Sequence, residues 1–197
     1  MTIIPATPAH AADITQLIMT AMTEDCCQYL AGKEHTLDDF YHMMLDLVLM
    51  DDSQYSWRNA FVAVDEEATE GNVEYAPVAG AIVGYNGADL HRLRRRFQEE
   101  ALKQLQMDYS QMDDETEAGE FYLDSLAIYP EYRRHGIARQ LLKRATEHAA
   151  SLNLSAALLV DKGNPNAERL YRSVGFEYCN DAMWGGHEMR HLRCPIV

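Results

Sequence analysis

A chain of 197 residues is the size of one domain, and it is long enough to bury a core that needs neither disulfides nor a metal. Hydrophobic residues make up 47% and charged residues 24%, which is ordinary for a globular protein. No apolar run approaches the ~20 residues that cross a bilayer, and the first residues lack the basic start of a signal peptide. We therefore expect a cytoplasmic protein that does not contact membranes.

The net charge of −14 is unevenly distributed along the chain. Residues 1–120 carry 7 basic and 23 acidic side chains, whereas residues 121–197 carry 10 and 8. The acidic part suits a cationic partner and the weakly basic part suits an anionic one. An acidic surface that only keeps the protein in solution explains the first part equally well. The acidic total argues against nucleic-acid binding, which normally needs a basic footprint.

The cysteines and histidines do not form a pattern typical of a metal site. None of the cysteines lies in a C-x-x-C spacing; they are Cys26, Cys27, Cys179 and Cys194. His187 and His191 stand four residues apart, which is the spacing of a helical metal-binding pair. Their segment is typical of a strand, so the spacing does not indicate such a pair. We therefore expect no metal.

The first half of the chain predicts a strand, two helices and a hairpin. Residues 2–6 are apolar and typical of a strand, and Thr7-Pro8 then begins a helix as its N-cap and first position. Thr36 caps a second helix that runs from Leu37 to about residue 50. Residues 51–58 are polar and turn-like. Residues 60–64 and 78–85 predict a hairpin, joined by an acidic turn over residues 65–75.

Residues 86–118 form an insertion between the hairpin and the next strand. Residues 88–107 have one apolar face and predict a helix. Its other face carries Arg92, Arg94, Arg95 and Arg96, which we interpret as a solvated surface, with a phosphate or partner site as the alternative. Residues 108–117 are acidic and lack apolar periodicity, so we expect a mobile loop there.

The second half alternates strands and helices. The pattern predicts a strand over residues 120–128, a helix over 136–152, a buried strand over 156–160 and a helix over 165–174. Gly175 ends the second helix as a C-cap. Residues 176–179 and 187–192 predict two closing strands.

The turn between the strand at 120–128 and the following helix has the features of an anion site. Its residues Arg133 to Ala138 place unpaired backbone N–H groups at the positive end of a helix dipole. Such a helix N-terminus binds phosphate groups, and Gly136 lets the backbone approach closely. The turn matches neither the dinucleotide fingerprint nor the P-loop.

Two segments carry a family resemblance. The run R-x-x-G-x-A at Arg133–Ala138, after a strand that ends L-A-I-x-P, resembles the acetyl-CoA loop of GNAT-family N-acetyltransferases. Downstream, residues 164–176 are similar to the family pattern N-x-x-A-x-x-L-Y-x-x-x-G-F. The resemblance is strong over about residues 119–180 and looser over residues 1–85, and the insertion lies outside the common pattern.

The resemblance implies a fold and an activity. The fold is an α/β (α+β) GNAT fold, in which helices flank a mixed, mostly antiparallel sheet with two splayed parallel strands. A single domain then spans residues 1–197 with the insertion at about 86–118. The implied activity is an N-acetyltransferase that moves an acetyl group from acetyl-CoA, its cosubstrate, to a primary amine by direct attack, with no metal.

The resemblance also assigns residues to the cosubstrate. The pantetheine arm lies in the gap beside Leu126, Ala127 and Ile128 and pairs with the strand backbone, and the amides of residues 135–139 hold the pyrophosphate. Asn164 contacts the pantetheine, and Tyr171 points at the thioester sulfur. The implied contact residues are Leu126, Ala127, Ile128, Arg133, Arg134, His135, Gly136, Ile137, Ala138, Arg139, Asn164 and Tyr171.

The reaction needs an acid for the departing thiolate and a base for the amine. Tyr171 is our candidate for the acid, with a packing role as the alternative. Some family members carry a Glu twelve residues before this Tyr, but Leu159 stands there in this chain. Asp124 is our candidate for the base, and Glu120 acting through water is the second choice; either could instead anchor substrate.

The acceptor has no readable motif. A small-molecule or protein amine fits the activity, and the acidic first part favours a cationic one. The alternative function is a non-catalytic acyl-CoA sensing module with the insertion as a partner-docking element. A Tyr placed at the sulfur favours the enzyme, because a binding module does not need it. The sequence leaves a homodimer open as the assembly state.

Overall fold

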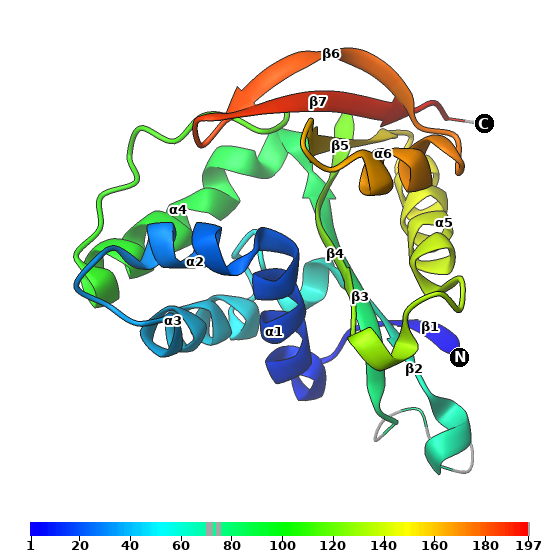
Figure 1. The fold of residues 1–197 in the computed structure, drawn as a ribbon, viewed down its shortest axis with the longest axis horizontal. Helices are drawn as coiled ribbons and strands as arrows, with labels where there is room; N and C mark the ends of the chain where they lie inside the picture. The colour runs from blue at the N-terminus through cyan, green and yellow to red at the C-terminus, as the bar shows by residue number, and fades with distance from the viewer. Residues whose placement is uncertain (70–72, 74–75, 197) are drawn as a thin grey trace.

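A seven-stranded sheet forms the centre of the computed structural model, which describes residues 1–69, 73 and 76–196. The strand order is β1-β2-β3-β4-β5-β7-β6 (Figure 1). Only β4 and β5 pair in parallel, and the other neighbours are antiparallel. The strands are β1 (Thr2–Pro5), β2 (Ala60–Val64), β3 (Val78–Asn86), β4 (Glu120–Ile128), β5 (Ser155–Asp161), β6 (Glu177–Trp184) and β7 (His187–Cys194). The expected mixed, mostly antiparallel sheet is confirmed.

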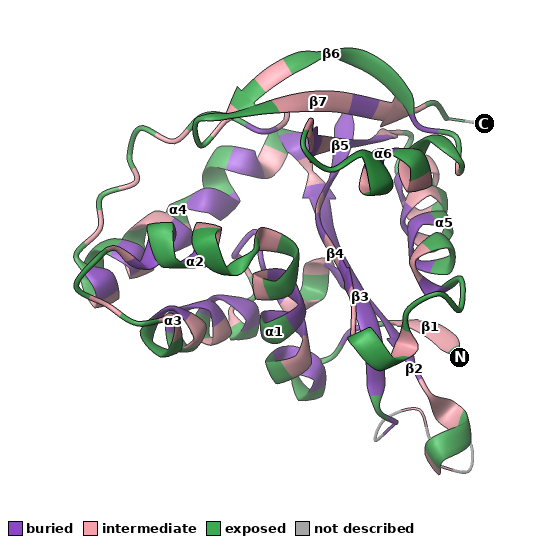
Figure 2. Ribbon diagram, in the orientation of Figure 1, coloured by how far each residue is buried: buried purple, intermediate pink, exposed green. Residues whose placement is uncertain are grey.

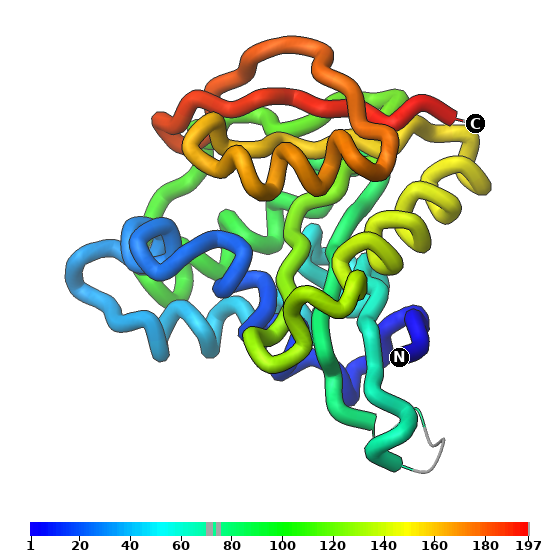
Figure 3. Tube along the Cα trace, turned by 45° about the vertical axis from the view of Figure 1, so that its right-hand side comes forward, coloured from blue at the N-terminus to red at the C-terminus, as the bar shows by residue number. Residues whose placement is uncertain are grey.

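Helices cover both faces of the sheet (Figures 1 and 3). One face carries α1 (Ala11–Met22), α2 (Glu24–Ala31), α3 (Leu37–Leu49) and α4 (Leu90–Glu100). The other face carries α5 (Ile137–Ser151) and α6 (Pro165–Arg172). Within the described residues, no helix combines the length and apolar character that a membrane crossing would need.

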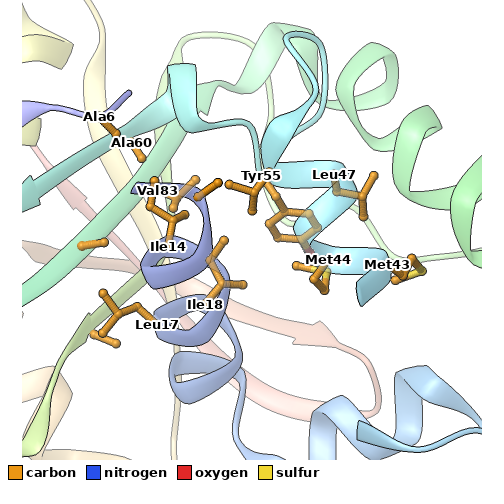
Figure 4. Packing of buried hydrophobic residues seen from close by; sticks show 14 of the residues in the cluster. Ala6, Ile14, Leu17, Ile18, Met43, Met44, Leu47, Tyr55, Ala60 and Val83 are labelled. Carbon is orange, nitrogen blue, oxygen red and sulfur yellow. The ribbon is translucent and has the colours of Figure 1, made fainter. Parts of the chain in front are cut away.

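Two large hydrophobic cores lie on the two faces of the sheet, and a third, small cluster packs Tyr85 and Tyr122 against α4. The first joins α1, α2 and α3 to inward residues of β2 and β3, and Figure 4 shows the ring of Tyr55 between Ile18 of α1 and Leu47 of α3. The second lies under α5, where Leu141 and Leu142 are fully buried. Figure 2 shows that β2, β3 and β4 are buried along most of their length, because both faces are covered.

Most sequence-predicted boundaries agree with the structure within a few residues. Thr36 caps α3, where its hydroxyl accepts the Asp39 N–H at 3.2 Å and its own N–H donates to the Asp39 carboxylate at 2.8 Å. Thr7 and Pro8 open a short 3-10 turn that leads into α1. The closing strands are longer than expected because they pair with each other along a hairpin. The expected acidic turn at 65–75 lies partly outside the described residues.

The central strands β4 and β5 separate after a short paired segment. Their register joins only residues 120–122 to residues 155–157, although β4 continues to Ile128 and β5 to Asp161. On its other edge β4 stays paired with β3 down to Ile128. The splayed parallel pair is thereby confirmed, and it leaves one edge of β4 without a strand partner inside the sheet.

Among the arginines of the insertion, Arg92 and Arg95 are exposed as expected, but the expectation of a solvated face was wrong for Arg94. Arg94 is only 3% exposed and pairs with Glu115 and, at 2.9 Å, with Asp114. Arg96 pairs with Asp52 at 2.8 Å, which ties α4 to the segment before β2. The sequence pattern shows a charged stripe but cannot show the carboxylates that fold back onto it.

The segment after α4 also packs, where a mobile loop was expected. The Arg94 guanidinium donates to the Asp113 carbonyl at 2.9 Å, and the Tyr109 hydroxyl donates to the Leu30 carbonyl at 2.9 Å. Glu115 is buried and accepts the Tyr85 hydroxyl at 2.8 Å. A single buried arginine with several acceptors therefore orders a stretch whose composition predicts a mobile loop.

Replacing Glu115 by Ala should destabilise the protein by about 3 kcal/mol, because losing one partner of a buried ion pair leaves the other charge uncompensated. Urea unfolding followed by circular dichroism measures this loss. The matched control is Glu117→Ala, since Glu117 is exposed on the same segment, and it should stay within about 0.5 kcal/mol of the parent. Equal losses in the two variants would contradict the packed segment.

Candidate active site

The open edge of β4 presents the backbone of Leu126 and Ile128 to the gap. The Tyr129 N–H donates to the Ala79 carbonyl on β3 at 2.9 Å. Because backbone groups alternate between the two edges of a strand, those of Leu126 and Ile128 face away from β3. The Ile128 carbonyl already accepts the Arg133 Nε–H at 3.0 Å. Ala127 differs from the expectation, since its backbone faces β3 and its side chain is buried in the first core.

The turn before α5 is a concave set of backbone donors. Arg134 and Gly136 both have a left-handed backbone, with φ of 66° and 77°. No described group accepts a backbone N–H from residues 134–139, and no side chain caps α5. Such left-handed turns at a helix N-terminus aim several N–H groups at one point, which favours an anion. A Cβ at Gly136 would meet no atom within 4 Å, so the space in front of this turn is open.

The charged side chains of this turn differ in how they are held. Arg134 and His135 are exposed. Arg139 instead donates to the carbonyl and to the hydroxyl of Ser173, each at 3.0 Å, which joins α5 to the end of α6. Beside Arg139, a groove of about 340 Å³ runs along α5 and includes Lys143 and Val174 in its lining. The lining of this groove therefore carries two cationic side chains, those of Arg139 and Lys143.

Asn164 and Tyr171 lie on α6, across the gap from β4. The Asn164 side chain accepts the Ala167 N–H at 3.1 Å and so acts as the N-cap of α6. The Tyr171 ring packs on Phe176 with centroids 6.0 Å apart. Burial raises the pKa of Tyr171 to about 12, so the hydroxyl keeps its proton throughout the neutral range.

Asp124 stands at a β-bulge of β4. Val83 of β3 pairs with Ser125 and Gly84 pairs with Leu123, which leaves Asp124 without a partner on β3. Gly84 is required there, because a Cβ would lie 2.7 Å from the Tyr122 carbonyl oxygen. Bulges often redirect a side chain next to an active site, and this one turns a carboxylate toward Gln54, in the segment after α3, and toward Arg94 of α4.

The environment of Asp124 makes its carboxyl group an unusually weak acid. Burial raises its pKa to about 6, although hydrogen bonds from Ser125 and Gln54 and the charge of Arg94 act in the opposite direction. The Ser125 hydroxyl donates at 2.7 Å, and the Gln54 amide donates at 3.5 Å. A carboxylate with a pKa near neutrality is suited to accept a proton and release it again.

Three buried tyrosines surround this carboxylate, and sequence reasoning missed all of them. The pKa of each is raised by burial first and then by the Asp124 charge; they are Tyr55, Tyr85 and Tyr122. The rings of Tyr85 and Tyr122 meet edge-on with centroids 5.8 Å apart. They come from a polar loop and two strands, so no local motif marks them.

Tyr122 links Asp124 to Tyr171. Apart from burial, the pKa of Tyr122 is raised by Asp124 and next by Tyr171, so the three side chains lie close enough to interact electrostatically. Tyr122 is also the last residue of β4 that pairs with β5. The two predicted catalytic residues therefore both lie near the residue at which the strands separate.

Glu120 is held in a way that prevents it from acting as a base. It is completely buried, accepts from Arg193 and from Thr116 at 3.0 Å each, and lies 2.9 Å from the His191 ring nitrogen. Burial alone would raise its pKa, but His191 and Arg193 lower it to about 2. Glu120 therefore stays ionised at neutral pH and joins β4 to β7. In the described part of the chain, no three His, Cys, Asp or Glu residues gather as metal ligands would.

Comparison with protein families gives one match that covers most of this architecture. The model described as "Acetyltransferase (GNAT) family" matches residues 30–176. This range includes the bulge, the donor turn and α6. No curated protein matches the chain significantly.

Solved structures share the fold at low sequence identity. An N-acetyltransferase from Staphylococcus aureus Mu50 is 22% identical with a TM-score of 0.81, and 98% of this chain and 100% of that chain are covered. The NatC complex bound to Gag peptide and CoA is 18% identical with a TM-score of 0.56 and full coverage of both chains. A spermidine N-acetyltransferase chimera from Vibrio cholerae and hSSAT is 15% identical with a TM-score of 0.54, covering 98% and 95%.

Proposed function

Because the chain belongs to the GNAT acetyltransferase family and is an acyltransferase, we propose that it transfers the acetyl group of acetyl-CoA directly to a primary amine. The observation that carries this proposal is the arrangement around the strand separation. The edge of β4 is open beyond Tyr122 and leads to a turn of free N–H groups before α5, and near Tyr122 lie Asp124, whose pKa is about 6, and the protonated Tyr171.

The residues present suit acetyl-CoA. The N–H groups of residues 135–139 would bind its pyrophosphate, with Arg133 and Arg134 adding positive charge. The backbone of Leu126 and Ile128 would pair with the amides of the pantetheine arm as an added strand does. Acetyl-CoA supplies the thioester that the amine attacks.

Two side chains would then move the protons. The neutral amine forms a bond to the acetyl carbon, and Asp124 accepts the proton that the nitrogen gives up. The carbon–sulfur bond breaks with its electron pair on sulfur, where the Tyr171 hydroxyl donates its hydrogen as negative charge develops. Asp124 carries out this step only when ionised, which at a pKa of about 6 it is near neutral pH.

A cationic amine is the acceptor that the charges favour. The acidic first part of the chain raises the local concentration of cations by long-range attraction. Among the structures that share the fold, one is named for spermidine and another is bound to a peptide, so both small and protein amines are represented. The acyl-CoA sensing alternative loses support because the insertion, its expected docking element, packs its charges onto its own molecule.

An amine panel with acetyl-CoA should release free CoA with at least one primary amine.

At saturating amine, kcat should rise with pH through about 6 and then level off, because only ionised Asp124 accepts a proton. Asp124→Asn should lose this limb and lower kcat by roughly 10²–10⁴. The control Asp25→Asn, at an exposed position of α2, should behave as the parent. A panel without any CoA release would refute the proposed enzyme.

Gly136→Glu should weaken acetyl-CoA binding at least about tenfold, a change of about 1.4 kcal/mol. The new carboxylate would occupy the open space where the pyrophosphate is proposed to bind. Calorimetry with acetyl-CoA measures the affinity. Gly185→Glu is the matched control, because Gly185 also has a positive φ and open space but lies at the β6–β7 hairpin. Equal affinity in the folded Gly136→Glu protein would exclude this turn as the phosphate site.

Tyr171→Phe should lower kcat by roughly 10²–10⁴, the usual effect of losing a positioned acid. Acetyl-CoA affinity should stay near the parental value, since the hydroxyl acts mainly in the transition state. Steady-state kinetics and calorimetry measure the two quantities. Tyr29→Phe, which removes an exposed hydroxyl, serves as the control. Parental turnover in Tyr171→Phe would mean that another group handles the departing sulfur.

A further inference from the structure

Gln54 has a buried acceptor that lacks a hydrogen-bond partner. Gln54 lies in the segment between α3 and β2 and is only 3% exposed. The Nε2 atom donates to Asp124 Oδ2 at 3.5 Å, whereas Oε1 is fully buried and unpaired among the described residues. Both atoms are bonded to one carbon, so Oε1 lies within a few ångströms of the same carboxylate. Buried polar atoms without a partner are rare in folded proteins and need an explanation.

The orientation of the Gln54 amide follows from electrostatics. Turning the amide over would direct Oε1 at the Asp124 carboxylate, and two acceptors would repel each other. The backbone is also fixed, because Asn59 Nδ2 donates to the carbonyls of Ser53 at 3.0 Å and of Gln54 at 3.2 Å. The Tyr55 N–H donates to the Ser53 hydroxyl at 3.1 Å. The segment is therefore held in place, and Oε1 stays close to the Asp124 carboxylate with its lone pairs free.

An N–H donor that comes next to Asp124 would complete this arrangement. We propose that Gln54 binds the acceptor nitrogen, with Oε1 accepting one N–H of the attacking primary amine while Nε2 orients the Asp124 carboxylate. This inference rests on the proposed acetyl transfer and adds the residue that selects the class of amine. Gln54 is a binding residue, and Asp124 remains the proton acceptor.

The count of N–H bonds explains the selectivity. A primary amine has two N–H bonds when it attacks; one proton passes to Asp124 as the carbon–nitrogen bond forms, and the carbon–sulfur bond breaks with its electrons on sulfur. The secondary amide product keeps the other N–H, which can stay bonded to Gln54 Oε1 throughout. A secondary amine ends as a tertiary amide without any N–H. Oε1 would then be left unpaired again, and a site built around an N–H donor rejects such an analogue strongly.

The test compares the best primary amine of the panel with its N-methyl derivative. In the parent protein kcat/KM should favour the primary amine by about 10²-fold or more. Gln54→Met keeps the length of the side chain and removes both amide atoms. It should lower kcat/KM for the primary amine by about 10- to 100-fold more than for the N-methyl amine, because both amines lose the Nε2 contact that orients Asp124 and only the primary amine loses a hydrogen bond to Oε1. The ratio between the two amines should therefore fall.

Gln98→Met is the matched control, because Gln98 lies on α4 and donates to the Tyr109 carbonyl at 3.0 Å. It should keep the parental ratio. Acetyl-CoA affinity, measured by calorimetry, should be the same in all variants and shows that each is folded.

A second variant, Gln54→Glu, separates binding from packing and serves if Gln54→Met does not fold. It retains an acceptor oxygen, so the preference for the primary amine should persist. Its negative charge should raise the pKa of Asp124 and move the acid limb of kcat above pH 6. An active parent whose amine ratio is unchanged in Gln54→Met, or a Gln54→Glu protein with neither effect, overturns the role of Gln54 alone. A parent that acetylates no amine overturns the proposed function and this role together.

Discussion

The backbone pairing between β4 and β5 ends at Tyr122 and Ala157, and the rest of the site depends on this interruption. A strand edge in the middle of a sheet carries N–H and C=O groups that need partners. Here those of Leu126 and Ile128 face a gap, and the donor turn before α5 stands at its end. A ligand with amide groups at one end and phosphates at the other matches both sets of groups, which is the reason that the fold suits acetyl-CoA.

The bulge at Asp124 adds a second constraint. By removing one residue from the β3 register, it directs a carboxyl group into a mostly buried, tyrosine-lined region. Burial makes the ionised form costly, and Ser125, Gln54 and Arg94 compensate only in part. The chain thus keeps one carboxyl group near its titration point while it holds another, Glu120, ionised through Arg193 and His191.

The insertion stabilises this region from behind. Arg94 binds the segment that follows α4 and contributes positive charge near Asp124, and Arg96 holds Asp52, two residues before Gln54. Tyr85 is fixed by Glu115 through a 2.8 Å hydrogen bond. The extra helix is therefore part of the wall around Asp124 and is not an appendage on the surface.

Local chemistry alone was enough to predict most of the elements and the turn of free N–H groups before α5. Thr36 before a periodic segment, Pro165 after Asn164 and the glycine at 136 act within one turn of chain, so the printed sequence contains the whole cause. The hydrophobic periods likewise predicted the strands at 60–64 and 120–128 with their observed limits. The resemblance of two short segments then supplied the mixed, mostly antiparallel sheet with its splayed parallel pair, whereas the strand order came from the structure.

Only the tertiary structure decided which polar residues are buried together. Residues 51–58 have the composition of a surface turn, yet Ser53, Gln54 and Tyr55 are buried because α3, α4 and β4 close around them. The arginines of α4 have the pattern of a solvated face, yet Arg94 finds its carboxylates some twenty residues later in the chain. Burial and ion pairing depend on which distant segments pack together. Neither the hydrophobic periodicity nor the local spacing of residues predicts these tertiary contacts.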